Sequence, residues 1–149
     1  MTDDMYHAKT WLNRCYNKAK QLEADRRMLE IMQSRLGANV SKYDSDGTEA
    51  HDPEAAKARH DDALLDYSLQ CDKVEKDAQS LSAEMTKTRR AIDELSDPAH
   101  QAVAIDRYIN RFKWEDIAKL EHISIAQVFR VHSAMLERIA PILRHKNFI

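Results

Sequence analysis

The chain has 149 residues, of which 43% are hydrophobic and 32% are charged, and its formal net charge is −2. These totals exclude a wholly disordered chain, and the presence of only two glycines favours helices over turn-rich β structure. The small net charge also excludes a protein that binds nucleic acid through bulk positive charge alone.

Charge is unevenly distributed along the sequence. Residues 97–149 contain eight lysines and arginines against six acidic residues, which gives a net charge of +2. Residues 1–96 hold the other 15 basic and 19 acidic residues, which gives −4. This asymmetry has the sign expected of a C-terminal part that contacts DNA.

The sequence predicts a cytoplasmic protein. Cys15 and Cys71 are too few and too far apart for a metal motif or a disulfide framework. Both fall on apolar helical stripes, which predicts buried free thiols and fits a reducing compartment. No apolar run follows the acidic start of the chain, so we expect no signal peptide. No stretch approaches the roughly 20 apolar residues of a membrane span, so we expect no membrane insertion.

Residues 4–36 are predicted to form one long amphipathic helix. Apolar or small residues recur in steps of three and four, which is a heptad pattern. Gly37 stands where a helix-ending residue is expected, and the turn formers that follow predict a flexible connector over residues 37–53. The members of the first stripe are Met5, Ala8, Leu12, Cys15, Ala19, Leu22, Leu29 and Leu36.

Residues 53–95 are predicted to form a second long helix with a more regular stripe. A helix with one apolar stripe cannot bury it alone, so residues 1–96 are expected to form a long antiparallel, coiled-coil-like hairpin, a pairing with a second copy, or both. This arm is interpreted either as a homodimerisation or partner-binding device, or as a packed hairpin with no separate task. The second stripe consists of Leu64, Tyr67, Cys71, Val74, Ala78, Leu81, Met85, Thr88, Ile92 and Leu95.

Residues 97–149 change to short apolar bursts, which predict three short helices with tight connections. Asp97 can cap the first of them, and Pro98 fits a first helical position. The fold predicted for the whole chain is therefore all-α, with a helical hairpin followed by a three-helix domain.

The last two predicted helices have the pattern of a helix-turn-helix unit. Ser124 is a suitable N-cap for the final helix, which would bury Val128, Val131, Met135 and Ile139. A recognition helix places its first turns in the major groove, where glutamine can bind adenine and arginine can bind guanine. Its outward side would carry Ala126, Gln127, Arg130 and Ser133.

A family resemblance rests on three stretches: VAIDRYI at 103–109, WEDIA at 114–118 and VFRVHSAMLERI at 128–139. Together they resemble region four of bacterial sigma factors, in particular small phage and prophage regulators in which a helical N-terminal part precedes such a domain. The resemblance implies binding of double-stranded DNA, control of transcription, RNA polymerase as a candidate partner, and no catalysis.

The predicted DNA-contacting residues are Ser124, Ala126, Gln127, Arg130, Ser133, Arg111 and Lys113. For Arg111, Lys113 and Lys119, contact with phosphate and plain solubility are both open interpretations. Trp114 is expected to anchor the core, whereas His132 fits either a DNA contact or local packing.

The sequence holds no recognisable catalytic constellation, phosphate loop or metal motif, so we expect no enzyme activity, cofactor or metal. Two alternatives to a transcription regulator stay open. One is a phage DNA-packaging oligomer similar to small terminase subunits, although those usually place the DNA-binding unit first. The other is a protein-interaction module whose helix-turn-helix no longer binds DNA.

Overall fold

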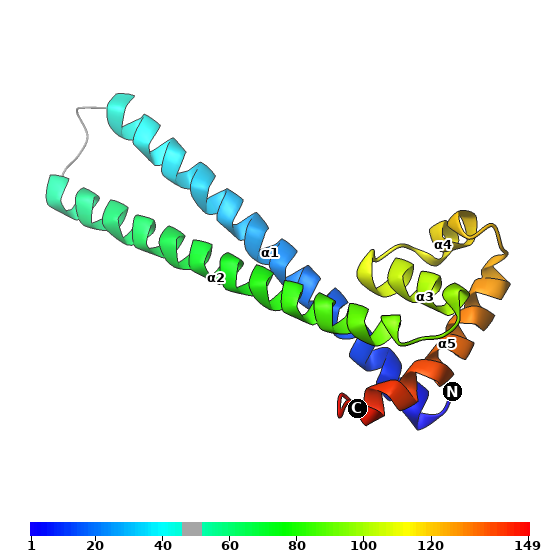
Figure 1. Cartoon of the computed structure of the whole chain (residues 1–149). Helices are drawn as coiled ribbons and strands as arrows, with labels where there is room; N and C mark the ends of the chain where they lie inside the picture. The colour runs from blue at the N-terminus through cyan, green and yellow to red at the C-terminus, as the bar shows by residue number, and fades with distance from the viewer. Residues whose placement is uncertain (46–51) are drawn as a thin grey trace. The chain divides into compact units, whose positions relative to one another are not determined.

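The computed structural model describes residues 1–45 and 52–149, with side chains described for 1–38 and 52–149. Within those ranges every regular element is helical, so the all-α prediction is confirmed. The elements are α1 (Asp3–Ser45), α2 (Pro53–Asp93), α3 (Pro98–Ala104), the π-helical turn η1 (Ile105–Ile109), α4 (Trp114–Leu120) and α5 (Ile125–His145), as Figure 1 shows.

The first helix is longer than the sequence predicts. It continues through Gly37 to Ser45, so the helix end expected at Gly37 is wrong and the connector does not begin there. Gly37 does not adopt the left-handed backbone of a helix-ending glycine. One glycine inside a helix costs only about 1 kcal/mol relative to alanine, which the rest of a long helix can offset. Residues 46–51 of the predicted connector lie outside the described residues.

The chain divides into two compact units, residues 1–19 with 81–149, and residues 20–80. This division differs from the boundary expected between residues 96 and 97. The first turns of α1 and the last turns of α2 bury their apolar side chains in one core with α5, so they belong to the same unit as the C-terminal helices.

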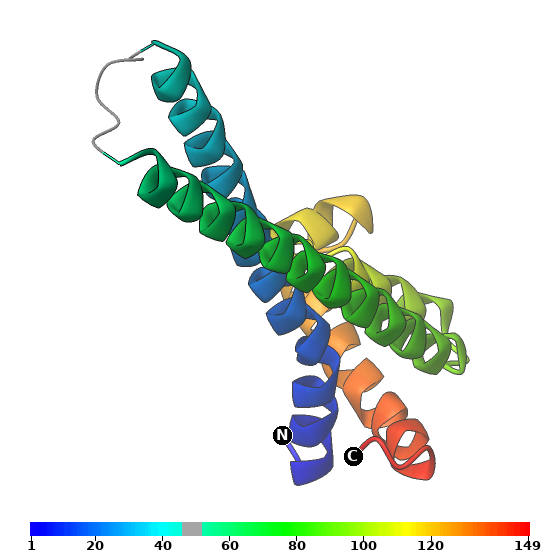
Figure 2. The ribbon, with the colours of Figure 1, turned by 90° about the vertical axis from the view of Figure 1, so that its left-hand side faces the viewer.

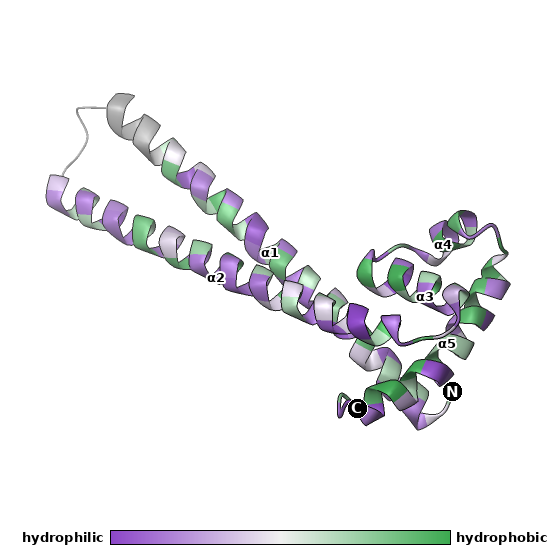
Figure 3. Cartoon of the chain, in the orientation of Figure 1, coloured by the Kyte–Doolittle hydropathy of each residue, from purple (hydrophilic) through white to green (hydrophobic). Residues whose placement is uncertain are grey.

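The first unit holds most of the fully buried side chains. Apolar residues recur along α3 and α5, as Figure 3 shows. A smaller cluster of Val103, Ile117, Ala118 and Val128 lies where α3, α4 and α5 meet. The main core includes Leu12 from α1, Ile92 from α2, and Met135, Leu136, Ile139 and Leu143 from α5.

Polar contacts fasten α1 to α2 inside the first unit. The Cys15 thiol lies 3.4 Å from the Thr88 hydroxyl, and both side chains are buried. Arg14 Nε lies 2.6 Å from Glu84 Oε2, and its guanidinium carbon lies 3.5 Å from the centre of the Trp11 ring. This ion pair lowers the pKa of Glu84. Cys15 is thus a buried free thiol, as predicted.

In the second unit, α1 and α2 run antiparallel, which both Figure 1 and Figure 2 show. A polar cluster fixes their register. Gln70 Nε2 donates to the backbone oxygen of Asp25 at 2.9 Å, and Lys73 Nζ lies 3.1 Å from its carboxylate. The predicted stripe is covered only partly here, since Leu64 is 45% exposed and Cys71 is half-buried. The apolar core of this unit is therefore thin.

None of the helices in the described ranges carries an apolar stretch long enough to cross a bilayer.

The shared core generates a stability prediction. Leu12→Ala should lower the free energy of unfolding by about 2–5 kcal/mol, because Leu12 is fully buried. Leu120→Ala, the same change at a residue that is 55% exposed, should alter it by less than about 0.5 kcal/mol. Both tryptophans, Trp11 and Trp114, belong to this unit, so urea unfolding followed by tryptophan fluorescence measures its stability. A similarly small effect of both substitutions would contradict the placement of α1 in this core.

Candidate nucleic-acid interface

The turn between α4 and α5 is closed by backbone hydrogen bonds and one side-chain cap. The amide of Ile123 donates to the Ala118 carbonyl at 3.1 Å, and His122 takes the left-handed conformation with φ of 56°. That conformation usually favours glycine, and it costs a residue with a Cβ roughly 1–2 kcal/mol. The Ser124 hydroxyl then accepts from the Gln127 amide at 3.2 Å, so the predicted N-cap of α5 is confirmed.

The first turns of α5 have one buried face and one exposed face. Val128, Met135 and Ile139 are buried, as the sequence predicts, whereas Val131, also predicted to be buried, is only half-buried. On the opposite side, the structure brings together five of the predicted contact residues, all exposed: Ser124, Ala126, Gln127, Arg130 and Ser133.

Two side chains on the exposed face of α5 are available for contacts outside the chain. Within the described residues, the side chains of Gln127 and Arg130 make no intramolecular hydrogen bond or ion pair. Ser124 differs, because its hydroxyl oxygen already serves the cap. The first turns of α5 therefore offer two long polar side chains side by side, held on a helix whose other face is anchored in the core.

Arg111 and Lys113 lie in the loop between η1 and α4, apart from the exposed face of α5. Arg111 has a φ of 60°, and the amide of the next residue, Phe112, donates back to the Asp106 carbonyl at 2.9 Å. Lys113 is exposed at the N-cap position of α4. The predicted contact residues thus fall into two groups, one at the start of α5 and one in this loop.

Aromatic side chains connect η1, α4 and α5. The half-buried Trp114 ring lies 5.3 Å from the Phe129 ring and 4.7 Å from the His132 ring, measured between centroids. The Tyr108 hydroxyl lies 2.7 Å from His132 Nε2. Trp114 therefore anchors the core as predicted. His132 is buried against its neighbours, which settles its two open interpretations in favour of packing.

Burial also decides the ionisation of this cluster. It raises the pKa of Tyr108, and it lowers the pKa of His132 to about 4, with smaller contributions from the positive charges of Lys9 and Arg107. His132 is therefore neutral at neutral pH. A charged imidazole at this position would lose its hydration, because the side chain is buried.

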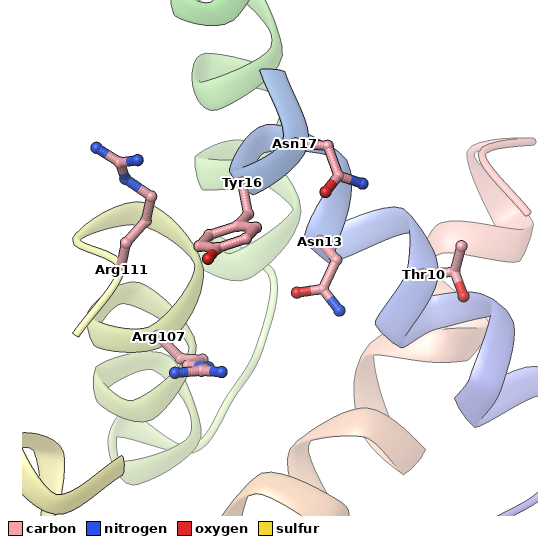
Figure 4. Close-up of a pocket in the computed structure, with 6 residues that line it drawn as sticks. All are labelled: Thr10, Asn13, Tyr16, Asn17, Arg107 and Arg111. Atoms are coloured by element: carbon pink, nitrogen blue, oxygen red, sulfur yellow. The ribbon is translucent and has the colours of Figure 1, made fainter. Parts of the chain in front are cut away.

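A polar pocket of about 440 Å³ lies between the first half of α1 and the segment that carries Arg107 and Arg111. Figure 4 shows Tyr16 extending from α1 toward that segment, with Asn13 and Asn17 on the same helix. The sequence patterns did not predict this pocket. Its one signal was the helical spacing of polar residues on α1 opposite the apolar stripe. The lining residues are Thr10, Asn13, Tyr16, Asn17, Arg107 and Arg111.

Apolar side chains also remain exposed beside the α4–α5 turn. Leu120 is 55% exposed, Ile125 is 41% exposed and Phe129 is 45% exposed. A shallow groove next to them is bordered by Glu115, Lys119 and Gln127 among others. The face that carries Gln127 and Arg130 is therefore mixed in character, with polar and apolar contact area side by side.

Among the residues that the structure describes, no three histidine, cysteine or acidic side chains gather as they would around a metal ion. No family model, characterised protein or solved structure matches this chain. Function is therefore inferred from the chain's own residues.

The buried histidine generates a pH prediction. Because folding lowers the pKa of His132 from 6.5 to about 4, the unfolded chain takes up a proton between these values and the folded chain does not. The contribution of His132 to the free energy of unfolding is fully present above pH 6.5. It is lost as the pH falls toward 4, by about 3 kcal/mol in all. We expect His132→Gln to flatten the pH dependence of the unfolding free energy in this window.

The matched control is His122→Gln, which changes an exposed histidine in the turn. Tryptophan-detected urea unfolding at about pH 7 and about pH 5 gives the two free energies that are compared. A pH dependence equally steep in the wild type and in both variants would show that His132 titrates normally.

Proposed function

We propose that the chain is a DNA-binding transcriptional regulator of the phage or prophage type, in which α4, the turn and α5 act as a sigma region-four-like helix-turn-helix. One observation carries the proposal. The first turns of α5 present Gln127 and Arg130 without intramolecular partners, on a helix whose opposite face is buried. A recognition helix needs this combination of a fixed backbone and unengaged polar side chains.

The chemistry of the exposed face suits base contacts in the major groove. A glutamine can pair with the N6 and N7 atoms of adenine, and an arginine can pair with the O6 and N7 atoms of guanine. Ile125 and Ala126 precede them, and apolar side chains at such positions can contact the methyl group of thymine. The face therefore favours a mixed site in which A·T pairs adjoin a G·C pair.

Phosphate contacts would come from the basic residues that flank this face. Lys113 and Lys119 are exposed on α4 and at its start, where the first helix of such a unit crosses the DNA backbone. Exposed Glu115 and Asp116 on the same helix partly offset their charge. The affinity of a single copy is therefore expected to be low and strongly dependent on salt.

We expect the double substitution Gln127→Ala with Arg130→Ala to abolish sequence-specific binding, since each bidentate base contact supplies about 1–3 kcal/mol. Sequences selected by the wild-type chain from a random duplex pool serve as probes in a gel-shift titration at low salt. Arg90→Ala removes an exposed arginine on α2 and is the matched control. No binding by the wild type at low salt, or equal binding by the double variant, would falsify the proposal.

Two copies acting together would compensate for the small reading surface, and we propose that residues 20–80 mediate such a homodimer. Among the side chains of this unit that the structure describes, five large apolar ones are exposed: Met28, Ile31, Leu64, Leu65 and Leu69. The core of the unit is thin, and burial of these side chains by a second copy would stabilise it in the manner of a helical bundle.

Leu69→Glu should therefore shift the chain from dimer toward monomer, because it puts a charge in the proposed contact. Ser82→Glu introduces the same charge at an exposed position of α2 outside residues 20–80 and should leave the dimer intact. Light scattering coupled to size-exclusion chromatography measures the mass of each form. A wild-type chain that is monomeric at all concentrations contradicts the dimer.

A protein-interaction module is the second candidate function, and exposed Leu120, Ile125 and Phe129 favour it. Apolar area of this kind on a helix-turn-helix would suit a protein surface such as that of RNA polymerase. Retention of the chain by immobilised polymerase, together with negative gel shifts, would support this function over DNA binding.

A further inference from the structure

The polar pocket of the first unit carries positive charge, although the protein as a whole is slightly acidic. Its lining contains two arginines, two asparagines, a threonine and a tyrosine, and no carboxylate. The chain as a whole carries a net charge of −2. The pocket's volume of about 440 Å³ falls within the usual range for sites that bind small ligands.

Arg107 is held in place at one side of the pocket. Its Nη1 donates to the Phe112 carbonyl at 3.0 Å, and its guanidinium carbon lies 4.3 Å from the centre of the Trp114 ring. These contacts use one of the five N–H donors of the side chain and one face of its plane. A positioned guanidinium loses little further freedom when it binds an anion, which favours affinity.

Arg111 occupies a backbone conformation that an arginine rarely adopts. At a φ of 60°, glycine or asparagine would cost less, by roughly 1–2 kcal/mol. Residues held in such conformations concentrate at functional sites, where the side chain is needed in that place. Here the side chain lines the pocket together with Arg107, and Figure 4 shows both on the segment that faces α1.

The opposite wall comes from a single face of α1. Asn13 and Asn17 are one helical turn apart, and each side-chain amide has two N–H donors. Thr10 contributes less, because its hydroxyl donates to the Tyr6 carbonyl at 2.9 Å. The pocket is therefore lined by two cations and by neutral groups that can donate hydrogen bonds.

From this arrangement we infer that the pocket binds a phosphate group. Arginine pairs with phosphate through two parallel N–H···O bonds, and the asparagines can serve the remaining oxygens. The group could belong to a free phosphorylated small molecule or to the backbone of bound DNA. The pocket shares no lining residue with the groove that Gln127 borders, so it is distinct from that groove.

The first test uses inorganic phosphate and pyrophosphate as probes in thermal unfolding at constant ionic strength. Both anions should raise the melting temperature of the wild type, with pyrophosphate the more effective. Arg111→Asn should remove the increase, and it should still fold because asparagine tolerates this φ. Arg90→Asn removes an exposed arginine on α2, outside the pocket, and should retain the full increase. No increase in the wild type, or the same increase in all three proteins, would overturn the inference.

A second measurement identifies the source of the phosphate once the first has shown the anion effect. If the group belongs to DNA, Arg111→Asn should weaken binding of the selected duplex, reduce the slope of log affinity against log salt by about one, and make pyrophosphate a competitor. If the phosphate group belongs to a small molecule, neither Arg111→Asn nor pyrophosphate should change duplex binding. Both results require the anion effect of the first test. That effect is expected even if the chain binds no DNA.

Discussion

The apolar stripe at the start of α1 is buried against residues of both α2 and α5. Leu12 meets Ile92 of α2 and the apolar residues of α5 in one core, so the first and last parts of the sequence become a single unit. Every other feature of that unit depends on this packing. It fixes the backbone of α5, whose outer face carries Gln127 and Arg130, and it brings the polar face of α1 opposite Arg107 and Arg111.

The two units are held together by different kinds of contact. The first unit relies on a contiguous apolar core and on buried pairs such as Cys15 with Thr88. Residues 20–80 rely on two helices whose register is set by Gln70 and Asp25, with large apolar side chains left exposed. A unit of the second kind gains most from a partner, because association supplies the burial that its own fold lacks.

Much of the fold could be predicted from local signals. The caps at Asp97 and Ser124 and the buried face of α5 were predictable, because capping and amphipathic periodicity act over a few residues. The continuation of α1 through Gly37 was not, since a preference of about 1 kcal/mol at one glycine is small beside the rest of the helix. The division into units was also hidden. A stripe shows which face is apolar, but not which helix will cover it.

The candidate site was predictable in the same uneven way. The exposed residues of α5 follow from helix geometry, whereas the pocket depends on the φ of Arg111 and on the approach of α1, which no local pattern encodes.

The backbone of η1 links the aromatic ring cluster to the basic pocket. In η1 the amide of Asn110 reaches back five residues to Ile105, so this turn holds one residue more than an α-helical turn would. The extra residue widens the turn, so the backbone of η1 sets where Tyr108 and the residues after it lie. Tyr108 contacts His132 from within this turn, and Arg111 follows its end by two residues. The ring cluster and the basic pocket therefore depend on one short backbone segment, and a substitution that changes the geometry of η1 would disturb both.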